Sequence, residues 1–315
     1  MLALAQGCRA TSTPFVVVAD RKSPATLDLP GATYFTLEEQ RRRYPALSDL
    51  LPVDNYARKN FGYLAAMDLG VEEIQETDDD NCPLPGFWHP VVRPIDVDVV
   101  ESSEHWFNAY SLFTSERIWP RGFPLEFVQR GADGIGISAG RNNGWILTGL
   151  ADGDPDVDAV YRMTCELPIV FRLRRPIALA PGTWCPFNSQ NTITRREAFA
   201  LLYMPVMCSI RMTDIWRSFV AQRCLWEAGE TVVFHSASVR QDRNEHNLLR
   251  DFELEIPGYL HNDTIRRLLD ETRLDARDMT RNLVLCYEVI SNQGFLPREE
   301  IPVVRIWCQE IDRLS

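Results

Sequence analysis

Short apolar runs alternate with amphipathic segments through the first 80 residues. Phe15–Ala19 is a continuous apolar run rich in β-branched residues, which predicts a strand buried on both faces. A later helix is expected to begin after Asp54, which can cap it, and to end before Gly70. The expected elements are strands at 15–19, 32–35 and 74–77, with helices at 37–43 and 56–69. Because strands and helices alternate, we predict an α/β fold with a doubly wound, mainly parallel sheet.

The remainder of the chain divides into an irregular part and a helical part. Residues 82–181 are rich in proline, glycine and aromatic residues and show little periodicity, and the glycines at 131–136 are expected to lie in a loop. A strand at 231–234 is expected to end at His235. Helices are predicted at 215–228, 263–274, 278–290 and 302–314. We therefore expect a catalytic domain at 1–255 and a C-terminal helical extension at 256–315 packed on it.

Length, composition and charge narrow the classes of function. The chain has 315 residues, of which 45% are hydrophobic, and a formal net charge of −11. An acidic surface repels phosphate backbones, so nucleic acid is excluded as the expected partner. No apolar stretch approaches the ~20 residues that a transmembrane helix needs. The composition defines no oligomeric state.

The cysteines and the N-terminus give an expectation about location. None of the eight cysteines forms a C-x-x-C pair, and most lie in apolar runs typical of buried free thiols. This favours a reducing compartment such as the cytoplasm. The N-terminal residues carry no export signal, and a Golgi location requires that an N-terminal anchor was removed.

The acidic run Asp78-Asp79-Asp80 is the sharpest chemical feature of the sequence. It directly follows an expected strand, and ligands of doubly wound sheets bind at the carboxyl ends of strands. Hard divalent cations such as Mg²⁺ and Mn²⁺ prefer oxygen ligands, so Asp78 and Asp80 are candidate metal ligands. An acidic surface turn is the alternative reading of the same residues.

Cationic side chains near this run could offset the charge of a diphosphate. Arg58 and Lys59 lie on the helix before the acidic run, where they either face a ligand or form a solvated helix face. Arg121 lies in the proline-fixed segment Trp119–Pro124, which suits the presentation of a guanidinium to a phosphate or a carboxylate. A purely structural arginine fits that segment equally well.

Three further positions carry candidate chemistry. The polar run Asn188–Thr192 either binds sugar hydroxyls or forms a turn. Asp214, at the start of a helix, is either a general base for an acceptor hydroxyl or an N-cap. His235 is a candidate third metal ligand, and His246 is a weaker candidate.

Five ordered blocks of the sequence resemble the STELLO-type glycosyltransferases. They are Tyr56–Leu64, Glu76–Asn81, Trp119–Leu125, Asn188–Thr192 and Met212–Arg223. A more distant resemblance links Arg121–Leu125, Asp214–Trp216 and His235–Ser238 to the reversibly glycosylated polypeptides, which are UDP-arabinopyranose mutases. In that family an arginine that would map onto Arg121 is self-glycosylated, but Phe123 and Leu125 depart from its motif.

These resemblances imply a GT-A fold, a nucleotide-sugar donor that is expected to be a UDP-sugar, and Mn²⁺ or Mg²⁺. We expect transfer of the sugar to a hydroxyl of a small-molecule or glycan acceptor. The alternatives are a sugar-nucleotide mutase or self-glycosylating protein with the same donor site, and a non-catalytic scaffold that binds nucleotide sugar. The expected roles are catalysis by Asp214 and Arg121, donor binding by Asp20, Arg58, Lys59, Asp78, Asp79, Asn188 and Arg217, and metal binding by Asp78, Asp80 and His235.

Overall fold

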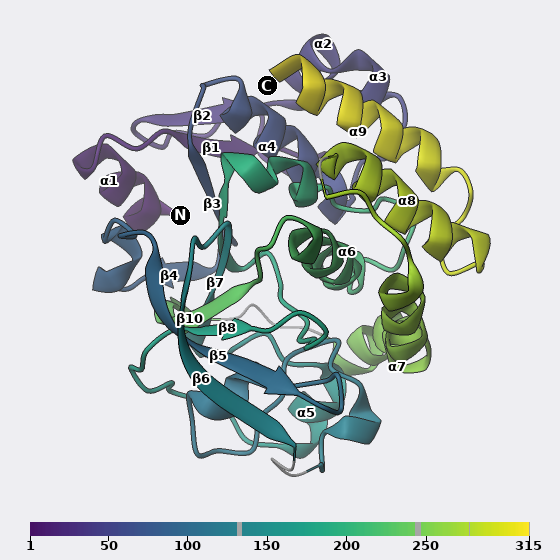
Figure 1. The fold of residues 1–315 in the computed structure, drawn as a ribbon. Helices are drawn as coiled ribbons and strands as arrows, with labels where there is room; N and C mark the ends of the chain where they lie inside the picture. The colour runs from purple at the N-terminus through teal and green to yellow at the C-terminus, as the bar shows by residue number, and fades with distance from the viewer. Residues whose placement is uncertain (131–133, 243–246, 277, 315) are drawn as a thin grey trace.

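The computed structural model describes residues 1–130, 134–242, 247–276 and 278–314 (Figure 1). His246 lies outside these described residues. The predicted class is confirmed: helices flank a central sheet, and a helical region follows at the C-terminus. The strands are β1 Phe15–Val18, β2 Ala32–Phe35, β3 Glu73–Thr77, β4 Asn81–Pro83, β5 Ile95–Ser102, β6 Ile135–Asn142, β7 Ile146–Gly153, β8 Ile177–Leu179, β9 Asn191–Arg195 and β10 Val233–Gln241. The α-helices are α1 Leu2–Ala10, α2 Leu37–Arg43, α3 Pro45–Ser48, α4 Lys59–Met67, α5 Ala159–Thr164, α6 Thr213–Glu227, α7 Leu248–Glu271, α8 Met279–Asn292 and α9 Glu300–Leu314.

The central sheet has eight strands, seven of them in the order β3-β9-β7-β10-β8-β5-β6, with β4 paired to β10. Its pairing is mixed: β7 runs parallel to β10 and β5 to β8, whereas β3–β9, β7–β9, β8–β10, β4–β10 and β5–β6 are antiparallel. It follows that β3, β7 and β10 run in the same direction and end at one edge of the sheet. The start of β9 lies at that same edge, which brings the residues after β3 close to those before β9.

The first two strands form a parallel pair, separate from the central sheet. All four residues of β1 are half-buried, so the expectation that this strand is buried on both faces is wrong. The reason is a cavity that opens against β1, which is described below. The predicted cap at Asp54 is also wrong: Asn55 accepts the Ala57 N–H at 2.8 Å and caps the 3₁₀ turn Tyr56–Arg58 that leads into α4.

The middle of the chain is more regular than its sequence pattern predicted. It contains β4 to β8 and α5, and β6 begins at Ile135, inside the segment expected to be a loop. Glycines at 136 and 140 hide the strand pattern of β6, because a strand is recognised from its side chains. Gly140 leaves room for the Val99 side chain on the paired strand β5, because a Cβ at position 140 would lie 2.6 Å from Val99 Cγ2.

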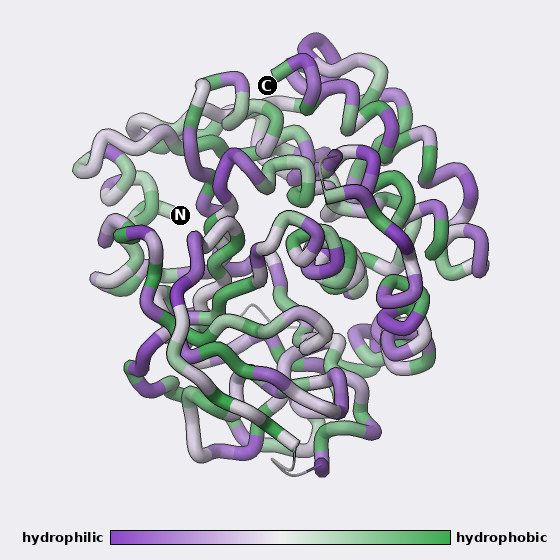
Figure 2. The backbone as a smooth tube through the Cα atoms, viewed as in Figure 1, coloured by the Kyte–Doolittle hydropathy of each residue, from purple (hydrophilic) through white to green (hydrophobic). Residues whose placement is uncertain are grey.

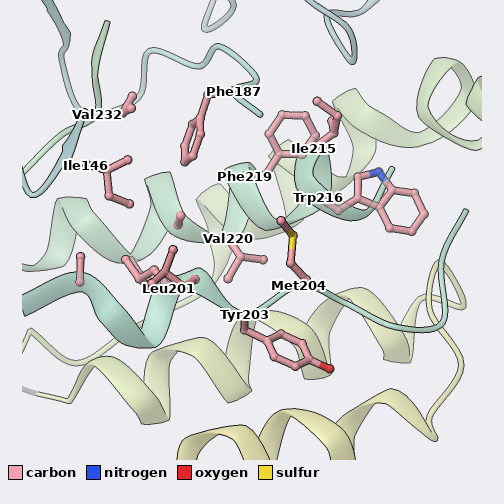
Figure 3. Packing of buried hydrophobic residues seen from close by; sticks show 14 of the residues in the cluster. Ile146, Phe187, Leu201, Tyr203, Met204, Ile215, Trp216, Phe219, Val220 and Val232 are labelled. Atoms are coloured by element: carbon pink, nitrogen blue, oxygen red, sulfur yellow. The ribbon is translucent and has the colours of Figure 1, made fainter. Parts of the chain in front are cut away.

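Helix α6 forms the centre of the hydrophobic core (Figure 3). Ile215, Phe219 and Val220 are at most 1% exposed and pack among side chains from the sheet region and from 198–204. Tyr203 lies on the opposite side, toward the C-terminal helices, where its ring contacts Tyr287 at a centroid distance of 5.2 Å. The sequence predicted α6 closely, and Gly229 follows it with φ of 74°, as a helix-ending glycine should.

The C-terminal helices continue the same core. Purple and green residues alternate around α8 and α9 in Figure 2, and the apolar face of α9 buries Val303, Trp307 and Ile311. Helix α7 begins at Leu248, whereas the sequence predicted a start at 263. The prediction was late because Pro257 and Gly258, which disfavour a helix, lie inside α7. The predicted domain boundary at 255/256 therefore falls within α7. Likewise, β10 continues past His235 to Gln241, with an irregularity between His235 and Val239.

Asp158, the N-cap of α5, is a buried carboxylate with a testable pH dependence. Burial raises the pKa of Asp158 from its ordinary 3.8 to about 6. Between these two values the native state keeps the proton that the unfolded state releases, so stability falls as pH rises. We expect Asp158→Asn to remove this dependence, which amounts to roughly 3 kcal/mol or less. Urea unfolding at pH 4 and pH 7 measures it, and parallel curves for the two proteins would contradict the expectation.

Candidate functional site

A cavity of ≈ 1060 Å³ lies between β1, β3 and the start of α4. Its walls along the strands are largely apolar and include Val16, Val18 and Ile74. Its polar lining is concentrated where β1 and β3 end, at Asp20, Lys59 and Asp78. Large clefts with apolar walls and a few convergent polar groups are typical of small-molecule sites. The cavity therefore has the shape and lining of a candidate small-molecule site, and Asp78 and Asp79 of the acidic run line it.

Lys59 and Asp78 form a close ion pair at the polar end. Lys59 Nζ donates to Asp78 Oδ1 at 2.7 Å, to the Ser189 carbonyl at 3.0 Å and to the Tyr56 hydroxyl at 2.8 Å. Tyr56 also donates to Asp78 Oδ1 at 3.1 Å and shares a hydrogen bond with the Ser189 hydroxyl. The pair is partly open, since the side chains of Lys59 and Asp78 are 20% and 28% exposed. Its position at the cavity leaves it able to meet a ligand.

The charge state of this pair follows from its surroundings. Burial alone would lower the pKa of the Lys59 amine, but Asp78 and the acidic groups behind it hold that pKa above its ordinary value. Burial raises the pKa of Asp78, and the Lys59 ammonium opposes that rise. Lys59 is therefore a protonated ammonium at neutral pH, and its three partners hold it at the polar end of the cavity.

Asp80 has an unsatisfied oxygen. Its Oδ2 accepts from Gln241 Nε2 at 3.0 Å, whereas its Oδ1 is buried without a hydrogen-bond partner. A buried acceptor without a partner costs free energy unless a ligand, ion or water completes it. Together with Asp78 just two residues away, this oxygen suits a hard divalent cation. Asp79 between them is exposed and lines the cavity.

The third predicted metal ligand lies elsewhere. His235 is on β10, where its ring packs against Gly149 and its Nδ1 lies 2.9 Å from the Ser236 carbonyl. Burial lowers the pKa of this imidazole. Within the described ranges, no group of three or more His, Cys, Asp or Glu side chains is arranged to hold a metal ion. The structure therefore does not gather Asp78, Asp80 and His235 into one ligand set.

Arg121 and Asp214 meet in the protein interior. The Arg121 guanidinium donates to both oxygens of Asp214 at 3.0 and 2.8 Å and to both oxygens of Asp156 at 2.8 Å. It also donates to the Arg211 carbonyl, so all five of its N–H groups are used. The side chains of Arg121 and Asp214 are 6% and 4% exposed. The sequence allowed either a phosphate or a carboxylate as the partner of Arg121. The structure shows two carboxylates, those of Asp156 and Asp214.

Two of the predicted donor-binding residues shape the rim of the cavity. Asp20 accepts the backbone N–H groups of Asp54 at 2.9 Å and Asn55 at 3.1 Å, so it orders the segment that leads to Tyr56. Arg58 lines the cavity but donates to Gln40 and to the carbonyls of Leu51 and Pro52. Its 4% exposure fits a support role for this wall.

Two other predicted donor-binding residues, Arg217 and Asn188, lie behind the cavity wall. Arg217 pairs with Glu76 at 2.8 Å, and both side chains are at most 3% exposed. Asn188 is 6% exposed, accepts the Gln190 N–H through its side chain at 3.1 Å, and its carbonyl accepts from Arg217 at 3.3 Å. These residues hold the end of β3 against the segment before β9.

Sequence reasoning missed four contributors to this site. Tyr56 carried a signal, since it lies three residues before Lys59 and thus on the same helical side. Ser189 lay inside the polar run but was not distinguished from its neighbours. Asp156 and Gln241 carried no local signal, because only the fold brings them to Arg121 and Asp80.

The fold and the cavity together define a class: an α/β protein with an acidic, lysine-containing ligand site at the edge of its sheet. Comparisons with known proteins show what the chain is similar to. A model of STELLO glycosyltransferases matches residues 211–315, which cover α6, β10 and the three C-terminal helices. The chain is 27% identical over 319 aligned residues to the probable glycosyltransferase STELLO2 of Arabidopsis thaliana, and 25% identical to STELLO1 of the same plant. The resemblance that the ordered motifs indicated is confirmed.

The similarity covers 94% of this chain but 41% of each of these relatives. The chain therefore corresponds to less than half the length of the curated proteins that it matches. Because 94% of this chain aligns with these relatives, the alignment includes α4, β3 and the acidic run. None of the helices within the described residues is long and apolar enough to cross a membrane.

Proposed function

We propose that the chain is a metal-dependent glycosyltransferase that moves a sugar from a nucleoside-diphosphate donor, preferentially a UDP-sugar, to an acceptor hydroxyl. The observation that carries the proposal is the polar end of the ≈ 1060 Å³ cavity, where Lys59 of α4 meets Asp78, the first residue after β3. The similarity to glycosyltransferases supports the reaction class. The apolar walls suit a nucleobase, and the polar end suits a diphosphate.

A diphosphate would need added positive charge at this site, because the acidic side chains that line the cavity outnumber the basic ones. The net charge of −11 would repel a nucleotide sugar, so a local cation must reverse the field at the site. Lys59 provides one positive charge there, and its partners keep it protonated. In transfer, this ammonium would stabilise the negative charge that develops on the leaving diphosphate.

Asp78 and the unsatisfied Oδ1 of Asp80 would hold the Mn²⁺ or Mg²⁺. Such a cation, when bound, neutralises the diphosphate and stabilises it as a leaving group. The carboxylates themselves fix where the diphosphate can lie, because they follow β3 directly. The buried, fully engaged guanidinium of Arg121 supports transfer to an external acceptor over the self-glycosylating alternative.

Donor turnover tests this function. The chain is incubated with Mn²⁺ and a panel of UDP-, GDP- and ADP-sugars, and the released nucleoside diphosphate is measured by mass spectrometry with a range of glycan acceptors. We expect release with one nucleobase, increased by an acceptor and abolished by a chelator. Saturable binding of a nucleotide sugar without release across the panel would instead favour a non-catalytic scaffold. Absence of binding to every donor would contradict the proposal.

A further inference from the structure

We propose that Asp214, Arg121 and Asp156 form a positioning unit that holds Ser189, and through Ser189 fixes Lys59 and Asp78 for the diphosphate. This inference rests on the proposed function, because that function assigns Lys59 and Asp78 to the donor. It gives Arg121 and Asp214 a role other than direct chemistry. It also assigns roles to Asp156 and Ser189, which no sequence motif distinguished.

The unit begins as a buried, alternating set of charges. Arg121 lies between two carboxylates, with Nε and Nη2 on Asp156 at 2.8 Å and Nη1 and Nη2 on Asp214 at 3.0 and 2.8 Å. Paired donors of this kind fix the orientation of a carboxylate as well as its position. All three side chains are at most 9% exposed, so water does not loosen the arrangement.

Asp214 transmits this order to Ser189. Its Oδ2 accepts the Ser189 backbone N–H at 3.3 Å, which anchors the turn before β9. Ser189 then bonds two residues that line the cavity: its carbonyl accepts from Lys59 Nζ at 3.0 Å, and its hydroxyl bonds the Tyr56 hydroxyl. Lys59 and Tyr56 both donate to Asp78 Oδ1. Six residues distant in sequence are thus joined by consecutive hydrogen bonds, which run from Asp156 through Arg121, Asp214, Ser189 and Lys59 to Asp78.

A general base would need different surroundings. Asp214 is 4% exposed, and both its oxygens already accept from Arg121. Burial alone would lower the pKa of Arg121, but Asp156 and Asp214 hold that pKa well above its ordinary value, so the guanidinium stays charged. A substrate hydroxyl would have to enter this buried place and compete with a permanent cation for the Asp214 carboxylate. The geometry favours a carboxylate that orients its neighbours.

The chain contains two lysines, Lys22 and Lys59, which permits a test that needs no ligand. Reductive methylation with ¹³C-formaldehyde labels both amines, and exposed Lys22 serves as the internal reference. In the wild type we expect Lys59 to react more slowly than Lys22, because three groups hold it. In Asp214→Asn the Lys59 rate should rise toward that of Lys22. If Asp214→Asn does not fold, Asp156→Asn makes the same prediction, because it removes the negative charge on the other side of Arg121.

Asp158→Asn is the matched control, because Asp158 is equally buried but bonds Trp119 and the Tyr161 N–H instead. It should leave the Lys59 rate as in the wild type even if the protein unfolds more easily. An unchanged Lys59 rate in both Asp214→Asn and Asp156→Asn would overturn the positioning role, whether or not a nucleotide binds.

Donor kinetics separate positioning from base catalysis. Loss of a supporting partner of a binding group typically weakens affinity by roughly 10–100-fold. We therefore expect Asp214→Asn to weaken binding of the nucleoside diphosphate with Mn²⁺ by about that factor. Unchanged nucleotide affinity with a collapse of kcat would identify Asp214 as the base and contradict the inference. If the wild type binds no nucleotide, the proposed function fails, and the Lys59 labelling alone decides the positioning role.

Discussion

Asp80→Asn is expected to reduce sugar transfer by at least about 10³-fold, because a metal's stabilisation of a leaving group amounts to several kcal/mol. The substitution preserves the size of the side chain and can preserve the hydrogen bond from Gln241 to Oδ2. What it removes is the charge beside the buried, partnerless Oδ1. The loss should therefore appear in activity and in metal affinity, not in folding. Initial rates at saturating donor and a series of Mn²⁺ concentrations measure it.

The control for this variant is Asp96→Asn on β5. The Asp96 side chain is 67% exposed and makes a loose contact with Arg141 at 3.4 Å, and four strands separate β5 from β3 in the sheet. It should keep wild-type activity with the same change in net charge. Wild-type turnover by Asp80→Asn would remove the metal site from the account.

The largest expected effect on stability comes from Glu76 and Arg217. Their side chains are 3% and 2% exposed, and Glu76 accepts from both Arg217 and the Tyr63 hydroxyl. Removing one partner leaves the other charge buried and unpaired, which costs about 3–5 kcal/mol. We expect Glu76→Gln to lower the free energy of unfolding by an amount in that range. Urea unfolding followed by tryptophan fluorescence measures it.

A double variant shows whether the unpaired charge is the cause. Glu76→Gln combined with Arg217→Met removes both charges and keeps most of the volume, so it should be more stable than Glu76→Gln alone. If Glu76→Gln alone costs less than about 1 kcal/mol, the pair contributes no more than an ordinary hydrogen bond. That result would contradict the support that we assign to it at the end of β3.

The parts of the fold that the sequence predicted well are those with a strong local pattern. Helix α2 begins and ends where its pattern predicts, and its capping box of Thr36 and Glu39 is present. Helix α6 was also predicted, because its apolar residues and Gly229 at its end agree. The strand that leads into Asp78 was predicted too, although Ile74 is its one apolar residue. The acidic run was correctly placed at the end of a strand, since it directly follows β3.

The parts that were missed depend on long-range contacts. The β5–β6 pair forms an edge of the sheet, and the exposed, glycine-containing β6 has no buried face to produce a pattern. The early start of α7 depends on tertiary packing that tolerates Pro257 inside it. The same holds in the site: Lys59 was predicted from its neighbourhood in sequence, whereas the partners Asp156 of Arg121 and Gln241 of Asp80 are supplied by the topology.

The central claim is that the cavity beside β3 binds a nucleoside diphosphate with the help of a divalent cation held by Asp78 and Asp80. Titration calorimetry of UDP into the wild type and Asp80→Asn, each with Mn²⁺ and with EDTA, tests it most directly. We expect saturable binding by the wild type that requires Mn²⁺ and is lost in Asp80→Asn. Binding that is equal with and without Mn²⁺, or equal in the two proteins, would contradict it.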